Sequence, residues 1–291
     1  MILIIFKTLR IRQWIKNLLV FTPVFFSLNL FNYYLLIKSI VVFLSFSFMA
    51  SVVYCINDIS DLEVDKSHPE KSKRPLASGY ISVFKVTVLS SFLFIFSLIL
   101  PFFIGAPILV YVILLSYLLM NILYSKWLKK IALVDMFILA IGFVFRVVIG
   151  GVVCDIELSH WIIILSFMLA LFLAITKRMN DVQIKESSGI DLRFASKGYT
   201  SEYLKILLGI TGAISIVTYI MYTLSEEVIS RFKSKHLYIS TIFVLLALFE
   251  FLNVTIIKKE SGNPTEVFYK NRLIQIAVLG WILYFFLMAY M

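Results

Sequence analysis

The chain has 291 residues, of which 61% are hydrophobic and only 15% charged. Soluble domains are about half apolar and about a quarter charged, so this composition excludes an ordinary soluble protein and indicates lipid as the surrounding solvent. The net charge of +10 does not indicate nucleic-acid binding, because the basic residues lie between long apolar runs. Two cysteines and three histidines are too scattered for a disulfide framework or a Cys/His metal site.

The apolar segments predict an all-α polytopic membrane protein. Residues 1–16 are basic and amphipathic, which predicts a surface-lying start to the first span. The uncharged stretch 86–125 contains Pro101, Gly105 and Pro107 and predicts two helices joined by a tight turn. We predict nine spans in one domain over 1–291, and in chain order they are 17–37, 39–57, two within 86–125, 131–153, 158–176, 206–225, 237–257 and 273–291.

The distribution of Lys and Arg predicts the orientation. Most of those outside the spans fall on the N-terminal segment and on the loops after the second, fourth, sixth and eighth spans. Such residues concentrate on the cytoplasmic side, so we expect a cytoplasmic N-terminus in the cell inner (plasma) membrane. The two longest loops on that side, about 59–84 and 177–204, are also the richest in acidic residues and are the expected active-site loops.

The first acidic group follows the second predicted span. Asn57, Asp58, Asp61 and Asp65 are spaced so that on a helix they share one face. Stacked carboxylates at a membrane helix end are costly unless a cation compensates them. Mg²⁺ is usually held by one or two carboxylates together with substrate phosphate oxygens, so the group predicts a Mg²⁺–diphosphate site. The alternative is a solvated acidic cap on a cytoplasmic loop.

Basic residues follow these acids directly, at Lys71, Lys73 and Arg74. Metal-binding acids followed by phosphate-binding bases favour a phosphorylated substrate over the acidic cap.

A second mixed group follows the sixth predicted span. Asp181 and Glu186 are candidate ligands of a second Mg²⁺, and Lys177, Arg178 and Arg193 are candidate phosphate contacts. For any single base, the positive charge common in cytoplasmic loops is an alternative explanation. We expect the two groups to converge on one diphosphate.

Further charged and aromatic residues lie in or beside the spans. Arg146 lies within the fifth predicted span, where ionisable groups are expensive and usually functional, and we expect it to contact a substrate phosphate. Asp135, about three turns earlier, is too far away for direct contact along the helix. Neither Asp135 nor Glu250 receives a role. Tyr124 and Lys129, near the end of the fourth span, are candidate substrate contacts or interfacial anchors.

These motifs resemble the UbiA superfamily of intramembrane prenyltransferases over essentially the whole chain. Within it, they are most similar to the phosphoribosyltransferase branch that acts on decaprenyl phosphate. Asp181 stands where that branch usually has Glu, and Lys185 replaces the second Asp typical of members that prenylate aromatic rings. The positions that match the branch are Arg10, Gln13, Trp14, Lys16 and Asn17; Lys73, Arg74, Pro75 and Gly79; Arg146, Gly150 and Gly151; and Lys177, Arg178, Asp181, Gln183, Glu186, Gly189, Arg193, Tyr199 and Thr200.

The resemblance implies nine transmembrane helices around a central cavity and Mg²⁺-dependent transfer of phosphoribose from phosphoribosyl diphosphate to a polyprenyl phosphate. The product would be a precursor of cell-wall pentose sugars. The implied catalytic residues are Asp58, Asp61 and Asp181. The implied metal ligands are Asn57, Asp58, Asp61, Asp65, Asp181 and Glu186. The implied substrate contacts are Lys16, Lys73, Arg74, Tyr124, Lys129, Arg146, Lys177, Arg178, Gln183, Arg193 and Tyr199.

Two other functions stay open from the sequence. A prenyltransferase with an aromatic acceptor would use the same metal site on a polyprenyl diphosphate. A transporter would place its acidic residues at mid-bilayer in broken helices, whereas here they gather at one interface. The sequence leaves open the prenyl chain length, the number of Mg²⁺ ions and whether the protein forms a homo-oligomer.

Overall fold

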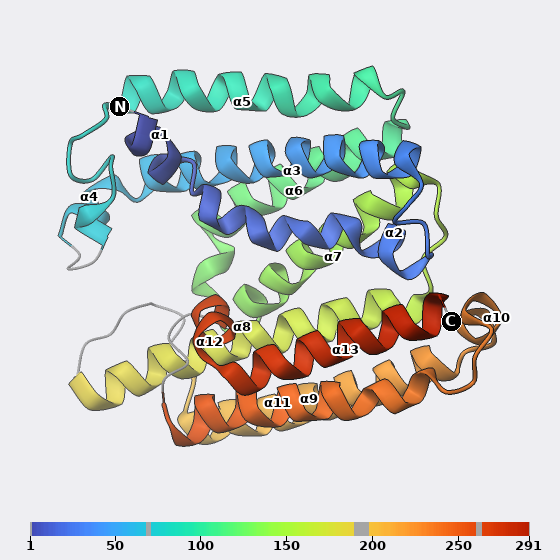
Figure 1. Ribbon diagram of the computed structural model, residues 1–291. Coiled ribbons are helices and arrows are strands. Elements are labelled where there is room, and N and C mark those ends of the chain that lie inside the picture. The colour runs from blue at the N-terminus through green and yellow to red at the C-terminus, as the bar shows by residue number, and fades with distance from the viewer. Residues whose placement is uncertain (1, 68–70, 189–197, 260–263, 291) are drawn as a thin grey trace. The chain divides into compact units, whose positions relative to one another are not determined.

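The computed structural model describes residues 2–67, 71–188, 198–259 and 264–290, and these ranges are helical with no strand (Figure 1). Eight helical segments within them are long and apolar enough to cross a membrane. The all-α membrane fold predicted from the sequence is therefore confirmed. The eight are α3 (Tyr33–Ser60), α5 (Val83–Phe103), α6 (Ile108–Lys126), α7 (Val134–Cys154), α8 (His160–Ser188), α9 (Ser201–Leu224), the run of η5 (Leu237–Ser240), α11 (Thr241–Leu252) and the π-helical η6 (Asn253–Ile257), and α13 (Arg272–Tyr290).

The first predicted span is wrong as a single helix. Residues 11–26 form a 3₁₀ helix, η1 (Ile11–Phe21), and a short α2 (Thr22–Phe26), and the chain then turns. Leu28 in this turn has a φ of 61°, and the Asn32 side chain caps α3 by accepting from the amides of Tyr34 and Leu35. Polar side chains that bond to the local backbone compete with helix, which explains the break. At about 2.0 Å per 3₁₀ residue and about 1.5 Å per α residue, η1 and α2 extend about 30 Å, near the hydrocarbon thickness.

The break predicted between the spans 17–37 and 39–57 is also absent, because Lys38 lies in the second turn of α3. Its Nζ lies 4.4 Å from the centre of the Tyr34 ring, one turn earlier. A lysine near a helix end can direct its charge along the helix to the interface, so it does not interrupt the span.

The chain divides into two compact units. Unit 1 comprises residues 1–128 and 145–158, and unit 2 comprises 129–144 and 159–291. In unit 1, α3 packs against η1, α5 and α6, around a core that includes Val20, Phe46 and Ile149. Gly150 allows α7 to approach η1, since a Cβ there would lie 2.0 Å from the Val20 carbonyl oxygen. The short elements of unit 1 are α1 (Ile2–Thr8), α4 (Leu62–Lys66) and η2 (Lys71–Lys73).

In unit 2, α8 packs against α9, and α11 packs against α13. The core includes Met136 of α7, Phe172 of α8 and Leu204 of α9. The remaining short elements are η3 (Leu128–Lys130), which begins one residue before unit 2, α10 (Glu226–Phe232) and α12 (Pro264–Lys270). The two-helix turn predicted within 86–125 is confirmed, since α5 ends at Phe103 and α6 begins at Ile108.

Candidate active site

The first acidic group lies where α3 passes into α4. Asp61 interrupts the helix between them, yet the Asp61 amide donates to the Asn57 carbonyl at 2.9 Å and the Asp65 amide to the Asp61 carbonyl at 2.8 Å. The helical hydrogen-bond spacing therefore continues through the break. Asp58 and Asp65, two turns apart, are both buried, at 4% and 1% exposure, and Asp61 is half-buried.

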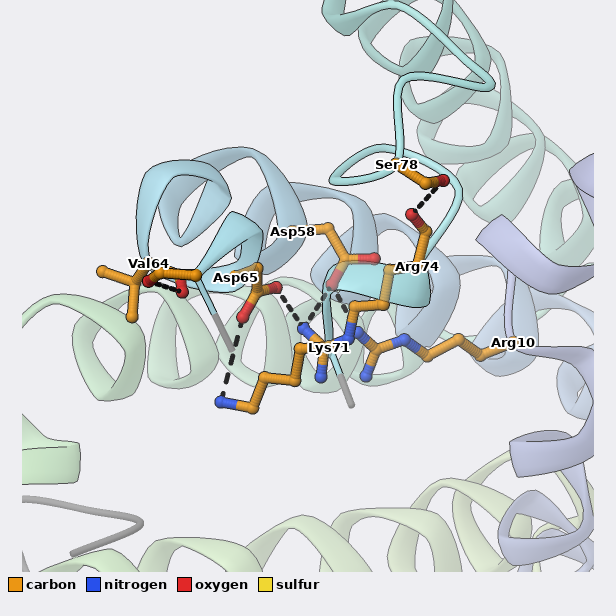
Figure 2. Close-up of polar contacts among 8 residues, drawn as sticks. Arg10, Asp58, Val64, Asp65, Lys71, Arg74 and Ser78 are labelled. Carbon is orange, nitrogen blue, oxygen red and sulfur yellow. Dashed lines mark hydrogen bonds and ion pairs between the residues drawn. The ribbon is translucent and has the colours of Figure 1, made fainter. Parts of the chain in front are cut away.

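Basic side chains converge on these two buried carboxylates (Figure 2). Arg74 Nη1 lies 2.5 Å from Asp65 Oδ2 and 3.1 Å from Asp58 Oδ1. The Arg10 guanidinium also donates to Asp58 Oδ1, and Lys71 Nζ lies 3.8 Å from Asp65 Oδ1. The Arg74 guanidinium thus bridges the two carboxylates, and Arg10 and Lys71 add positive charge on either side.

Sequence reasoning did not place Arg10 at this site, because it lies 48 residues before Asp58. The sequence did contain one indication, because Arg10 is the first residue of the N-terminal motif that matches the phosphoribosyltransferase branch. In the structure Arg10 has a φ of 51° between α1 and η1 and its guanidinium lies 4.9 Å from the centre of the Tyr54 ring. The turn and this contact direct the side chain back toward α3.

Arg146 is buried in unit 1, at 5% exposure. Arg146 Nε donates to Asn17 Oδ1 at 2.7 Å, and Nη2 lies 3.4 Å from the Tyr117 hydroxyl. Its guanidinium stacks on the Phe46 ring at 4.8 Å. These contacts orient Arg146 toward η1.

The other predicted residues of unit 1 lie on η1, α3, η2 and α6. Lys16 on η1 is half-buried, and its ammonium group lies within electrostatic range of the positive charges of Arg146 and Arg10. The Asn57 side-chain oxygen accepts a hydrogen bond from the Ser125 hydroxyl. Lys73 is exposed on η2 and Tyr124 is half-buried near the end of α6.

The donor set of unit 1 fits a divalent cation held jointly with phosphate oxygens. Asp58 and Asp65 supply carboxylate oxygens, the ligands that Mg²⁺ prefers, and both already meet one cationic group. Asp65 Oδ1 is buried and makes no hydrogen bond within the described residues. Across those same ranges no cluster of three or more His, Cys, Asp or Glu side chains is placed to hold a metal. The arrangement fits a Mg²⁺ that completes its shell with substrate and water rather than an all-protein cage.

The second mixed group lies on α8, which continues beyond the predicted span and carries the motif as helix as far as Ser188. Arg178, only 1% exposed, places Nε 2.5 Å from Asp135 Oδ2 and Nη1 3.0 Å from Asp181 Oδ2. The Tyr199 hydroxyl donates to Asp135 Oδ1 at 2.9 Å and accepts from the Leu133 amide at 2.5 Å. Burial raises the pKa of Tyr199, so its hydroxyl keeps the proton that it donates.

The remaining predicted residues of unit 2 are spread around α8 and its neighbours. Lys177 is half-buried, and Gln183 Nε2 donates to the Thr255 carbonyl of η6 at 3.1 Å. Glu186 is exposed and lies five residues after Asp181, about 140° around the helix, so the two carboxylates do not share a face. Lys129 on η3 is half-buried, whereas Arg193 lies outside the described residues.

Glu250, to which the sequence assigned no role, accepts three hydrogen bonds from side chains. It accepts hydrogen bonds from Asn253 at 2.9 Å, Lys258 at 2.9 Å and Asn271 at 2.8 Å. These partners are the first residue of η6, the residue after η6 and the residue between α12 and α13. Glu250 therefore anchors this end of α11, a structural role that the sequence did not indicate.

The chain matches the model of the UbiA prenyltransferase family over residues 18–193. It is 30% identical to the decaprenyl-phosphate phosphoribosyltransferase of Mycolicibacterium smegmatis, over 95% of this chain and 89% of that protein. The chain belongs to the UbiA prenyltransferase family. This UbiA family member is a transferase and a multi-pass membrane protein.

Two further comparisons agree with this membership. The decaprenyl-phosphate phosphoribosyltransferase of Corynebacterium glutamicum is 27% identical, over 95% of this chain and 83% of that protein. A solved UbiA homolog from Archaeoglobus fulgidus, bound to DMAPP and Mg²⁺, has a TM-score of 0.70 at 20% identity and is covered over 98% of each chain. The structural likeness shows that the fold is shared.

Proposed function

We propose that this UbiA family member transfers a phosphoribosyl group from phosphoribosyl diphosphate to a polyprenyl phosphate of decaprenyl type and releases diphosphate. The product would serve as a precursor for cell-wall pentose sugars. The observation that carries the proposal is the pair of buried carboxylates, Asp58 and Asp65, gathered on Arg74 and flanked by further bases. The near-full-length similarity to relatives named decaprenyl-phosphate phosphoribosyltransferase supports the choice of substrates.

The acidic residues have the role of metal ligands in this proposal. Asp58, Asp61 and Asp65 would hold Mg²⁺ in unit 1, together with Asn57, and Asp181 would be the ligand in unit 2. When bound, Mg²⁺ neutralises the charge that develops on the departing diphosphate. Glu186 belongs to the same motif, but it lies on another face of α8. We therefore do not propose that Glu186 and Asp181 share one Mg²⁺ ion.

The basic residues bind the phosphate groups. Arg10, Lys71 and Arg74 surround the carboxylates and are positioned to exchange these partners for the diphosphate oxygens. Lys16 and Arg146 form a second positive group in unit 1, suited to the other phosphate of the substrate pair. The remaining assigned contacts are Lys73, Tyr124, Lys129, Lys177, Arg178, Gln183, Arg193 and Tyr199.

The chemistry needs no general base. An oxygen of the polyprenyl phosphate, already ionised near neutral pH, forms a bond to the anomeric carbon of the ribose. The bond from that carbon to the diphosphate oxygen breaks, and its electron pair leaves with the diphosphate. The fixed positive side chains stabilise the charge on the leaving group, which is the largest contribution that a preorganised site makes.

The proposal places the protein in the inner (plasma) membrane with the N-terminus and both acidic groups on the cytoplasmic side. The excess of Lys and Arg around these groups supports this orientation. Phosphoribosyl diphosphate is charged and soluble, so a cytoplasmic site gives it direct access, whereas the polyprenyl phosphate reaches the site from the lipid.

Diphosphate release tests the substrate pair. Purified protein is incubated with phosphoribosyl diphosphate and a polyprenyl phosphate, and separately with a polyprenyl diphosphate and 4-hydroxybenzoate, both with Mg²⁺. We expect release only in the first mixture. Release confined to the second mixture would establish the aromatic prenyltransferase instead, and the proposed substrates would be wrong.

A further inference from the structure

Asp135 has no role in the reaction described so far, yet its burial requires an explanation. It lies in the first turn of α7, and its side chain is fully buried at 0% exposure. A carboxylate at the start of a membrane-spanning helix is costly unless partners compensate it. The helix N-terminus gives it some compensation, since negative charge is favoured there.

The partners of Asp135 come from two other parts of unit 2. Its Oδ2 pairs with Nε of Arg178 on α8 at 2.5 Å, and its Oδ1 accepts from the Tyr199 hydroxyl at 2.9 Å. The same hydroxyl accepts from the amide of Leu133, whose φ is 67°. Both oxygens of Asp135 are therefore held, and the backbone just before α7 is fixed by the same contacts.

Arg178 connects this anchored carboxylate to Asp181. Nε of the guanidinium pairs with Asp135. Its Nη1 lies 3.0 Å from Oδ2 of Asp181, which is one turn further along α8. A guanidinium is planar and rigid, so the bond at Nε fixes which way Nη1 points. Without the charge of Asp135, the ion pair that holds the Nε edge of Arg178 would be lost, and the guanidinium would compete more strongly with a metal ion for the Asp181 carboxylate.

We infer that Asp135 is a positioning residue that divides Arg178 between two carboxylates and so keeps Asp181 available to a divalent cation. This inference rests on the metal role proposed for Asp181. Residues that orient a metal ligand without touching the metal commonly change metal affinity by about 10- to 100-fold when they are replaced.

Binding of Mn²⁺, as a paramagnetic substitute for Mg²⁺, tests the inference on the purified full-length protein in lipid nanodiscs, without substrates. The wild type, Asp135→Asn, Arg178→Gln and the double variant are titrated and free Mn²⁺ is measured by electron paramagnetic resonance. We expect Asp135→Asn to weaken Mn²⁺ binding about tenfold in the wild-type background. In the Arg178→Gln background it should change binding less than about twofold, because the residue it acts through is gone.

Three further variants sharpen the test. Asp135→Glu keeps the charge and should restore affinity to within about threefold of the wild type. Tyr199→Phe removes one hydrogen bond without removing charge, so it should fold even where Asp135→Asn does not, and should weaken Mn²⁺ binding in the same direction. Glu227→Gln, a carboxylate-to-amide change in the exposed Glu227–Arg231 pair of α10, is the matched control and should leave Mn²⁺ affinity unchanged.

The outcomes separate this inference from the proposed function. An equal loss in both backgrounds would show a general effect of charge or folding and would overturn the positioning role. Unchanged Mn²⁺ binding in Asp135→Asn and in Tyr199→Phe, together with weakened binding in Asp181→Asn, would also overturn it while leaving the metal role of Asp181 intact. Unchanged binding in Asp181→Asn would refute the proposed metal role itself.

Discussion

Replacing Arg74 by alanine should make the stability of the protein depend on divalent cations. Arg74 is the group shared by Asp58 and Asp65, whose side chains are only 5% and 2% exposed, while Arg74 itself is 29% exposed. Removing one partner from a fully buried ion pair costs about 3–5 kcal/mol. An exposed pair is worth at most about 1 kcal/mol.

The magnitude for Arg74 lies between these limits. Arg10 stays on Asp58, and Lys71, at 3.8 Å, stays near Asp65, so both carboxylates keep a cationic neighbour. We expect Arg74→Ala to cost about 2 kcal/mol in the absence of metal. At about 2–4 °C per kcal/mol for a chain of this size class, the midpoint of thermal unfolding should fall by about 4–8 °C.

Mg²⁺ should reverse this loss. A ligand at 100 times its dissociation constant stabilises the folded state by about 2.7 kcal/mol. In the wild type Mg²⁺ must displace Arg74, whereas in Arg74→Ala it meets two carboxylates with less compensation. The rise in midpoint on adding Mg²⁺ should therefore be larger in the variant than in the wild type.

The assay is thermal unfolding of purified protein in detergent, followed by tryptophan fluorescence, with EDTA and with a Mg²⁺ series. Arg74→Lys keeps a charge and should lose less stability, and Lys66→Ala, which breaks only the exposed pair with Glu63, is the matched control. An unchanged midpoint in EDTA, combined with the same Mg²⁺ response in Arg74→Ala and the wild type, would refute the idea that Arg74 and the metal compete for one carboxylate pair.

Three other predictions concern packing, catalysis and binding. Gly150→Ala should reduce the yield of folded protein in detergent, because the added Cβ would clash with the Val20 backbone. Gly209→Ala is the control: no atom lies within 4 Å of its added Cβ, so it should be neutral or stabilise α9 by about 0.5–1 kcal/mol. Size-exclusion profiles and thermal midpoints of the two variants make the comparison. Asp58→Asn should abolish transfer while the elution profile stays that of folded protein, and EDTA should abolish transfer by the wild type; turnover at full strength in either case would contradict a metal role. Lys177→Ala should raise KM for phosphoribosyl diphosphate more than it lowers kcat, and an unchanged KM in initial-rate assays would contradict its phosphate contact.

The sequence predicted the fold well where hydrophobicity alone decides the structure. The long uncharged runs are helices, and the Pro101–Pro107 break is a turn. It failed at residues 17–37, where composition satisfies a membrane helix but the local hydrogen bonds of Asn29 and Asn32 favour a turn. Hydropathy averages over a window and does not register one or two side chains that bond to the backbone.

The site was predicted in part for a related reason. The i, i+3 and i+7 spacing identified Asp58 and Asp65 as neighbours, since helical geometry fixes such distances. The contact of Arg10 with Asp58 and that of Arg178 with Asp135 join residues 48 and 43 positions apart. These pairings depend on tertiary packing, which one sequence does not encode in any local pattern. Asp58 lies in unit 1 and Asp181 in unit 2, and the convergence expected of the two groups stays a prediction.

The identity of the lipid product tests the central claim most directly. Purified protein in lipid nanodiscs is given Mg²⁺, phosphoribosyl diphosphate and a polyprenyl phosphate, and the lipid extract is analysed by mass spectrometry. The account predicts a polyprenyl phosphate that has gained one phosphoribosyl group and has kept its own phosphate. A polyprenyl phosphate recovered unchanged, from protein that does prenylate an aromatic acceptor when supplied with polyprenyl diphosphate, would contradict it.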